Sequence, residues 1–380
     1  MNHKDYLTNK MFCPVPWTGL MYNFDGTIKN CIRSAAPIGN LRENSVEEIL
    51  LNSKNLETKS SMLNNEPGSR CHPCYDLEKG QNSFDIISDR VFYLRELKDV
   101  PITTYEDINQ FDLKKIDVRW SNLCNFGCIY CSAEYSSRWE NELKIKIDTP
   151  DALQQQRFKE FIFGNAKKLK HVYLAGGEPL LMKENLELLD LLNTDVKIRI
   201  NTNLSKTDTR VFEKVCSFKN VHWTVSVETI EEEYEYIRYG ANWDNFLNNL
   251  KIISNLKHKI SFNMLYFALN STSIFNCIDF LKQLGFHNNS FVIGTLLDPE
   301  DLNIRHLPDS MLNLARENLQ KRLNEKPGFL LENGLQNIFE YINRPLNGNA
   351  NKVFDYLKVL DTRRNLDSKK IFKELYNYGN

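Results

Sequence analysis

The sequence has no long hydrophobic run and no excess of charge of either sign. Its apolar stretches, such as residues 188–192, are far too short to span a bilayer, and the N-terminal residues lack the uninterrupted apolar segment of a signal peptide. With 48 Lys and Arg against 49 Asp and Glu, the formal charge of −1 gives no global attraction to nucleic acid or to an anionic membrane. We therefore expect a cytoplasmic protein with no membrane partner, and the charge argues against a nucleic-acid substrate.

The sequence also lacks low-complexity tracts and the cysteine pattern of a disulfide framework. A chain of 380 residues with 42% hydrophobic and 26% charged residues has the composition of a globular protein of two or three units. The chain has nine cysteines, which is an odd number, and most of them lie in clusters. We also expect no export signal. This pattern argues against disulfides and favours metal ligation or catalysis.

Between residues 113 and 297, short β-rich apolar stretches alternate with stretches of helical spacing. Strands are expected near 114–121, 171–176, 196–202, 221–228, 259–268 and 291–296, and helices at 185–193, 207–218, 243–256 and 274–284. Six strand-helix units in series predict an α/β fold with a parallel sheet and right-handed crossovers. Periodicity alone leaves open whether the sheet curls into a partial barrel or stays an open, doubly wound sheet.

The segments on either side of this repeat have a different character. Residues 1–80 contain a hairpin-like turn at Gly26 and one expected helix from Ser45 to about Leu63, whose start has the capping-box spacing of Ser45 and Glu48. We expect a small metal-stapled domain at 1–80, a charged linker at 81–112, the α/β core at 113–300 and a helical extension at 301–380.

The expected C-terminal extension is helical throughout. Helices are predicted at 308–324, 334–343, 351–361 and 367–377. Asp361, Arg363 and Arg364 are expected to belong to the charged surface of these helices. The alternative is that they cover the core or shape its substrate opening.

Three cysteines at C-x3-C-x2-C spacing, Cys124, Cys128 and Cys131, follow directly after the first strand of the repeat. A loop this short can direct three thiolates at one small cluster, and Gly127 permits the sharp turn that this requires. Three ligands leave one iron of a 4Fe-4S cluster open to a small molecule. The alternative is a zinc site or three unrelated core cysteines, but zinc sites usually combine two distant cysteine pairs.

This triad resembles the hallmark of the radical S-adenosylmethionine (SAM) superfamily, whose core is a partial (β/α)6 barrel of the TIM type. The resemblance implies that the three cysteines hold a 4Fe-4S cluster and that Tyr130 lies beside the adenine of SAM. The second strand ends in Gly176-Gly177-Glu178-Pro179, which is similar to the family segment that contacts the amino group of SAM. The glycines permit a close backbone approach to a ligand, although an ordinary strand-to-helix turn would have the same sequence.

Further resemblances lie at the ends of the later strands, where parallel sheets assemble their active sites. Asn203 ends the third strand, Ser226 and Glu228 end the fourth, and Asn263 lies on the fifth. Arg238 corresponds to the arginine that relatives place near the SAM carboxylate, for which a guanidinium is a natural partner. The resemblance implies that all five residues contact SAM; ordinary turn or strand-end roles are the alternative for Asn203, Ser226 and Asn263.

The remaining cysteines include a second pattern, which resembles the first half of the SPASM motif, called a twitch domain. It comprises Cys13, Gly26, Cys31, Cys71 and Cys74. The resemblance implies one auxiliary 4Fe-4S cluster held by four thiolates, in a domain that here precedes the core. The alternative is a four-cysteine zinc site. Cys216 and Cys277 lie among apolar neighbours in helical stretches, and we expect them to be buried and inert.

The resemblance implies a radical SAM enzyme with three cofactors, namely the 4Fe-4S cluster of the triad, SAM and the auxiliary 4Fe-4S cluster. In the family, reductive cleavage of SAM yields a 5′-deoxyadenosyl radical that abstracts a hydrogen from the substrate. A fully ligated auxiliary cluster would accept an electron from the substrate radical. We therefore expect an oxidation or a cross-link, first of all on a peptide or protein, as in the maturation of ribosomally made peptides.

Two alternatives remain open at the level of the sequence. One is a radical SAM dehydrogenase or epimerase acting on a sugar, an aminocyclitol or another small molecule. The other is a non-catalytic iron-sulfur or zinc scaffold. A flavodoxin or ferredoxin is the expected electron donor, and no residue identifies itself as the catalytic group that takes the substrate proton.

Overall fold

The computed structural model describes residues 9–79, 88–101, 103–344 and 348–378. The chain forms two compact units, each made of more than one segment. Unit 1 consists of Met1–Leu123, Lys146–Ile200 and Arg210–Val221, and unit 2 of Cys124–Ile145, Asn201–Thr209 and His222–Asn380. These units interleave along the chain, so they differ from the consecutive divisions expected at 1–80, 81–112, 113–300 and 301–380.

Unit 1 is built on a mixed sheet with the strand order β3-β2-β1-β4-β5-β6. Its strands are β1 (Gly19–Asn23), β2 (Thr27–Lys29), β3 (Gly39–Asn40), β4 (Lys115–Arg119), β5 (His171–Leu174) and β6 (Lys197–Thr202), the last two residues of which belong to unit 2. β1 and β2 form the expected antiparallel hairpin around Gly26, while β1 pairs with β4 in parallel. The N-terminal hairpin therefore extends the sheet of the core, which the sequence did not predict.

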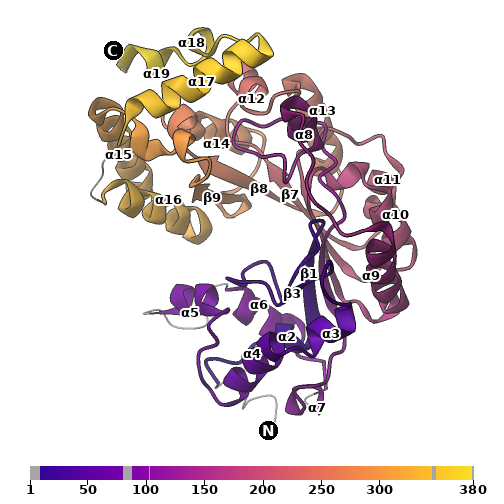
Figure 1. The fold of residues 1–380 in the computed structure, drawn as a ribbon. Coiled ribbons are helices and arrows are strands. Elements are labelled where there is room, and N and C mark those ends of the chain that lie inside the picture. Colours follow the sequence, from indigo (N-terminus) through magenta and orange to yellow (C-terminus); the bar gives the residue numbers. More distant parts are fainter. Residues whose placement is uncertain (1–8, 80–87, 102, 345–347, 379–380) are drawn as a thin grey trace. The chain divides into compact units, whose positions relative to one another are not determined.

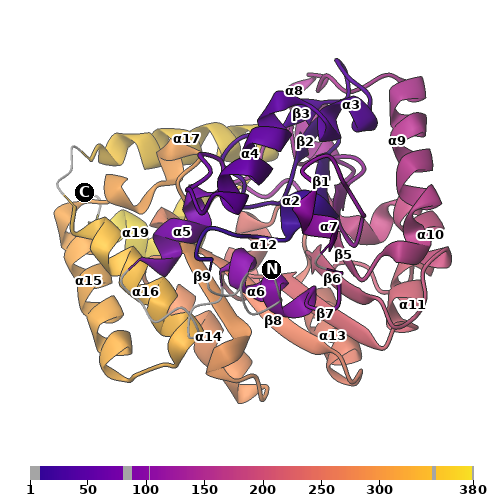
Figure 2. The ribbon, with the colours of Figure 1, turned by 90° about the horizontal axis from the view of Figure 1, so that it is seen from below.

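The two faces of this sheet differ in polarity. Ile116, Val172 and Ile198 are register partners on one face and are buried. Figures 1 and 2 show three helices on one side of the strands: α9 (Ala152–Gly164), α10 (Lys183–Asp190) and α11 (Arg210–Cys216). Phe158 of α9 contacts Tyr22 of β1, with ring centroids 4.2 Å apart, so α9 packs on the apolar face. The alternate residues of β4, which are Lys115, Asp117 and Arg119, point to the opposite face.

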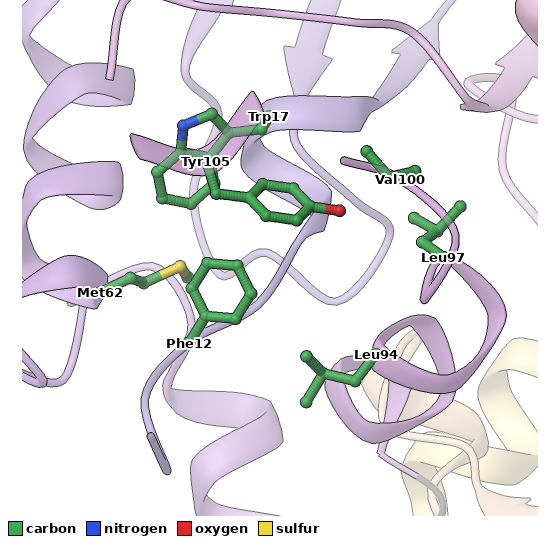
Figure 3. Packing of buried hydrophobic residues seen from close by; sticks show 7 residues of the cluster. All are labelled: Phe12, Trp17, Met62, Leu94, Leu97, Val100 and Tyr105. Carbon is green, nitrogen blue, oxygen red and sulfur yellow. The ribbon is translucent and has the colours of Figure 1, made fainter. Parts of the chain in front are cut away.

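The expected charged linker is part of the core of unit 1, and its residues 81–87 lie outside the described residues. It forms α6 (Asp89–Glu96) and α7 (Thr103–Glu106). Figure 3 shows how its apolar side chains pack against the N-terminal segment, in a cluster of Phe12, Trp17, Met62, Leu94, Leu97, Val100 and Tyr105. The linker prediction was wrong because the many charged residues around Leu94 and Leu97 obscured an apolar stripe of helical spacing.

The helix expected from Ser45 to Leu63 is two helices, α3 (Val46–Leu50) and α4 (Ser53–Leu63). The capping box at Ser45 and Glu48 is confirmed, since each side chain bonds the other residue's backbone N–H. The chain breaks at Asn52, whose side chain accepts a hydrogen bond from the backbone of Asn55 and begins the second helix. The other helices of unit 1 are α2 (Val15–Thr18) and α5 (His72–Glu78).

Unit 2 contains the parallel strands β7 (Asn220–Ser226), β8 (Lys259–Tyr266) and β9 (Phe291–Thr295), paired in that order; the first two residues of β7 belong to unit 1. Its helices are α8 (Ser137–Leu143), α12 (Glu231–Ile237), α13 (Trp243–Ser254), α14 (Ile274–Gln283), α15 (Asp309–Asn324), α16 (Phe329–Ile342), α17 (Ala350–Arg364), α18 (Ser368–Ile371) and α19 (Lys373–Tyr378). The six expected core strands and the four expected C-terminal helical stretches are thus present, with shifted ends. Among the described residues, no helix is long and apolar enough to cross a membrane.

Candidate metal centres

The loop that carries the three-cysteine motif lies in unit 2 and is fixed by its backbone. The N–H of Gly127 donates to the carbonyl of Tyr239 at 2.9 Å, and the N–H of Ile129 donates to the carbonyl of Ile237 at 2.8 Å. The indole of Trp139 donates to the carbonyl of Cys128 at 2.8 Å. These hydrogen bonds fix the backbone of the loop. They do not involve the thiol groups, whose neighbours are the side chains described below.

The three thiols of this loop differ in burial. Cys128 is 9% exposed, while Cys124 and Cys131 are half-buried. Burial, and then the neighbouring Cys128, raise the pKa of Cys131 to about 12, and burial also raises the pKa of Cys128. Thiols in this state are protonated at neutral pH, so a metal that binds them must displace their protons.

Asn203, predicted from the sequence to contact SAM, lies beside the first cysteine of the motif. Its Nδ2 lies 3.9 Å from the sulfur of Cys124 and donates to Oδ1 of Asn125 at 3.2 Å. The backbone N–H of Phe126 also points to the sulfur of Cys124, at 3.5 Å. Two N–H groups are therefore directed at one thiol, and such hydrogen bonds stabilise the charge of a thiolate bound to metal.

Three other expected site residues form one buried network. Nε of Arg238 donates to Glu228 at 2.8 Å, and the hydroxyl of Tyr130 donates to the same carboxylate at 2.9 Å. Glu228 and Arg238 are 1% and 3% exposed. Nη1 of Arg238 lies 4.0 Å from the sulfur of Cys128. The sequence predicted three separate SAM contacts, whereas here Glu228 holds both Tyr130 and Arg238, and the arginine faces the thiol.

Ser226 and Asn263 are neighbours in the sheet of unit 2. They are register partners in β7 and β8, and the N–H of Val227 donates to the carbonyl of Asn263 at 3.3 Å. Both side chains are half-buried at the carboxyl-terminal part of the strands. Their proposed contacts with SAM remain predictions.

The glycine-rich turn after β5 belongs to unit 1 and packs closely on the segment just before Cys124. Gly176 has a φ of +113°, which favours glycine, and a β-carbon on Gly177 would lie 2.3 Å from the carbonyl oxygen of Leu123. The N–H of Glu178 donates to that carbonyl at 2.8 Å. The Glu178 side chain is completely buried and accepts from the N–H of Leu180, so Pro179 begins a short 3-10 turn. Only glycine fits at residue 177 without moving this backbone.

The second cysteine set surrounds a single cavity in unit 1. Cys13, Cys31, Cys71 and Cys74 line it together with Arg33, Asp89 and Arg90. After burial, the nearby Cys71 and Cys31 contribute most to raising the pKa of Cys13, which shows that the thiols lie within electrostatic reach of one another. Burial likewise raises the pKa of Cys31 to about 11 and that of Cys71 to about 12.

Local structure explains how these four distant cysteines meet. Cys71 and Cys74 lie at the start of α5, and the N–H of Cys74 donates to the carbonyl of Cys71 at 3.1 Å. The hydroxyl of Tyr75 donates to the carbonyl of Met11 at 2.8 Å, which ties α5 to the segment before Cys13. Arg90 of α6 donates to the carbonyl of Phe12 at 3.0 Å. The cavity is thus closed by a segment that the sequence assigned to a linker.

The donor sets fit iron-sulfur clusters. Across the described ranges, no three or more His, Cys, Asp or Glu side chains are arranged to hold a single metal ion. The four thiols of unit 1 line one cavity, and cysteine thiolates are the ligands of 4Fe-4S clusters. The three thiols in unit 2 suit a cluster with one open iron. The four thiols in unit 1 suit a cluster in which every iron has a thiolate ligand.

Sequence reasoning missed the part that α17 plays at the triad loop. The hydroxyl of Tyr356 donates to the carbonyl of Ile129 at 2.7 Å. Arg364, expected on the charged helical surface, is 7% exposed and stacks on Trp139 and Tyr239 at 4.4 and 4.3 Å, and it pairs with Glu142.

The expectation for Asp361 also needs correction. Its carboxylate accepts from the hydroxyl of Tyr236 at 2.8 Å and from Ser368, so it joins α12 to the start of α18. Both Asp361 and Arg364 have partners remote in sequence, and no local pattern indicates such pairs. Arg363 is exposed, as expected.

Comparison with known protein families agrees with these two centres. A family model described as the radical SAM superfamily matches residues 118–281. Residues 118–281 form a radical SAM domain. A second model, described as the SPASM iron-sulfur cluster-binding domain, matches residues 13–75. The radical SAM domain contains the triad, and the SPASM match includes all four cysteines of the cavity.

Individual relatives cover the chain only in part. The 7-carboxy-7-deazaguanine synthase of Clostridium acetobutylicum is 30% identical over 133 residues, which are 34% of this chain and 54% of that protein. Native anSMEcpe with bound AdoMet is 18% identical, with a TM-score of 0.42 over 56% of this chain and 61% of that one. SuiB of Streptococcus suis bound to precursor peptide SuiA is 15% identical, with a TM-score of 0.41 over 74% and 63%. The chain spans about half the length of the curated relative.

The radical SAM and SPASM domains establish the fold class and the cofactors predicted from the sequence. They imply a 4Fe-4S cluster with SAM in the first domain and an auxiliary iron-sulfur cluster in the second. Of the two cysteines outside these sets, Cys277 is buried, as predicted, while Cys216 is half-exposed.

Proposed function

We propose that the chain is a radical SAM oxidoreductase whose first cluster is held by Cys124, Cys128 and Cys131. When bound, that cluster supplies the electron that cleaves SAM into methionine and a 5′-deoxyadenosyl radical, which abstracts a hydrogen from the substrate. The observation that carries this proposal is the loop of three thiols in unit 2, with the guanidinium of Arg238 facing Cys128 and the amide of Asn203 facing Cys124.

In this proposal the cofactors carry out the bond cleavage, and the protein side chains position the cofactors. Glu228 orients Arg238 and Tyr130 through three hydrogen bonds, so that the cationic head stays beside Cys128. The SAM contacts predicted from the sequence are kept as proposals residue by residue. In unit 2 they are Ser226, Arg238 and Asn263, and in unit 1 they are Gly176, Gly177, Glu178 and Pro179.

The second centre is proposed to be an auxiliary 4Fe-4S cluster held by Cys13, Cys31, Cys71 and Cys74, as in a twitch domain. Because four thiolates leave no open iron, this cluster is suited to accept an electron from the substrate rather than to bind it. The reaction is then an oxidation or a cross-link, and a peptide or protein is our first candidate substrate. A flavodoxin or ferredoxin would supply electrons, and cysteines that ligate metal rather than form disulfides suit a reducing compartment such as the cytoplasm.

The second candidate is an oxidation or epimerisation of a small molecule. It is supported by the partial match to a 7-carboxy-7-deazaguanine synthase, which lies at 30% identity over 133 residues. An oxidation of a small molecule would use the same two clusters. An epimerisation would instead return a hydrogen atom to the substrate radical and would pass no electron to the auxiliary cluster.

The proposal is tested by the formation of 5′-deoxyadenosine. The full chain, reconstituted anaerobically with iron and sulfide, is incubated with SAM and dithionite, and the product is measured by chromatography. We expect 5′-deoxyadenosine from the wild type and from the control Cys216→Ser, and none from a Cys124→Ala/Cys128→Ala/Cys131→Ala variant. A wild type that holds a reduced cluster and forms no 5′-deoxyadenosine would contradict the enzyme proposal.

A further inference from the structure

The polar face of the unit 1 sheet carries charged side chains in register with one another. Asp117 of β4 is the register partner of Tyr173 in β5, and Tyr173 is the partner of Arg199 in β6. One row further along β4, Arg119 is the partner of Asn23 in β1. Because register partners point to the same face, these five side chains share one surface of the sheet.

Two of the charges on this face neutralise each other. Nζ of Lys115 lies 2.9 Å from Oδ2 of Asp117, and each side chain is 2% exposed. The ammonium group also lies 5.0 Å from the centre of the Tyr93 ring, on α6. The ion pair is therefore internal to the unit, and the ammonium group of Lys115 already balances the carboxylate of Asp117.

Arg119 and Arg199 lie on either side of one aromatic ring. Their guanidinium carbons are 5.9 and 5.3 Å from the centroid of Tyr173. Arg119 is 8% exposed, and within the described residues its Nη1 has no hydrogen-bond partner. Oδ1 of the neighbouring Asn23 is also buried without a partner among those residues. A buried donor and a buried acceptor without partners are costly unless a ligand satisfies them.

Helix α6 connects this surface with the cavity of the four cysteines. Asp89 and Arg90 at its start line the cavity, and the ring of Tyr93 on the same helix lies 5.0 Å from the ammonium group of Lys115 on the polar face. A ligand on this face would therefore lie near the second centre.

We propose that Arg119 and Arg199 bind a carboxylate of the substrate on this face, with Asn23 accepting a hydrogen bond from a neighbouring N–H of the substrate. The planar fork of a guanidinium matches a carboxylate. An acidic side chain within a peptide supplies both groups. The identification of this ligand as the substrate rests on the proposed function, whereas the binding of a carboxylate does not.

The test is binding of small probes to the reconstituted full chain, measured by calorimetry at low ionic strength without SAM or reductant. The probes are N-acetylglutamate amide, its uncharged counterpart N-acetylglutamine amide, glutarate and inorganic phosphate. We expect the carboxylates to bind at least tenfold more tightly than N-acetylglutamine amide. Tighter binding of N-acetylglutamate amide than of glutarate supports a peptide source for the carboxylate, and the reverse order supports a small molecule.

Matched variants decide which residues bind. Arg119→Gln and Arg199→Gln are each expected to weaken carboxylate binding at least tenfold. Because Arg199 is exposed, its replacement leaves the core of the unit intact. Arg42→Gln, which removes the exposed partner of Asp148 in the same unit, should bind as the wild type does. Unchanged binding in Arg199→Gln, or tighter binding of phosphate than of either carboxylate, would overturn the proposal. Because this assay needs no SAM cleavage, it can succeed or fail independently of 5′-deoxyadenosine formation.

Discussion

His171 begins β5 on the polar face of unit 1, and its ring is enclosed by charged and aromatic neighbours. Its Nε2 lies 3.3 Å from Glu96, and the rings of Phe92 and Tyr93 contact it edge-on. Burial lowers the pKa of His171 to about 4; Glu96 acts in the opposite direction, and Lys197, Lys115 and Lys170 lower the pKa further. The imidazole of the folded protein is therefore neutral at pH 7 and resists protonation.

The unfolded chain has an ordinary histidine with a pKa near 6.5, so between about pH 6.5 and 4 it binds more protons than the folded protein. The free energy of unfolding consequently falls as the pH falls through this window, by at most about 3 kcal/mol from this group. Urea unfolding of His171→Gln from pH 7 to 4 should show a smaller fall than the wild type. The exposed His287→Gln serves as the control, and an equal fall in His171→Gln would rule out this role.

Single residues at the triad also show what a sequence can predict. Asn203 was predicted to contact SAM as a residue at the end of a parallel strand, where sheets place their sites, and it lies beside Cys124. The pairing of Arg238 with Glu228 could not be predicted. The two lie ten residues apart on either side of α12, and their contact depends on how that helix packs.

Helix α17 stabilises the cysteine loop from outside the radical SAM match. Arg364 fills the space between Trp139 and Tyr239, and its guanidinium pairs with Glu142 at 3.1 Å. Its Nη2 would lie 3.2 Å from a β-carbon on Gly127, so the arginine packs directly on the loop. We infer that the C-terminal helix limits the movement of the residues between the thiols.

Replacing Arg364 by Met should lower the free energy of unfolding by about 1–3 kcal/mol, because Glu142 loses its buried partner and two aromatic rings lose a stacked cation. Arg363→Met is the matched control. Arg363 approaches the same carboxylate at 3.5 Å but is exposed, so its loss should cost about 0.5 kcal/mol or less. Chemical denaturation measures both values, and equal effects of the two substitutions would show that burial at residue 364 is unimportant.

At the level of elements, the sequence predicted what periodicity determines and missed what tertiary packing determines. The six core strands and the C-terminal helices were located because apolar residues recur at strand and helix spacing. α6 was mistaken for a linker because the charged residues Asp89, Arg95 and Glu96 alternate with its apolar residues, and only the packing of Leu94 with Phe12 identifies it as core.

In the molecule as a whole, the two sets of thiols belong to different units. The triad lies in unit 2 with its partners Asn203, Glu228 and Arg238, and the four-cysteine cavity lies in unit 1 with Arg90. The units could not be predicted from the sequence, because each unit combines segments that are far apart along the chain. Each set has its own buried surroundings, so each cluster should form without the other.

The most direct test of two separate clusters, one of them open to SAM, is electron paramagnetic resonance combined with iron analysis. The reconstituted wild type should hold about eight irons per chain, and Cys71→Ala/Cys74→Ala should hold about four. The reduced spectrum of Cys71→Ala/Cys74→Ala should shift when SAM is added. That of Cys124→Ala/Cys128→Ala/Cys131→Ala, which also should hold about four irons, should not shift. A SAM-dependent shift in the triple variant, or none in the double variant, would contradict the assignment of the open cluster to residues 124–131.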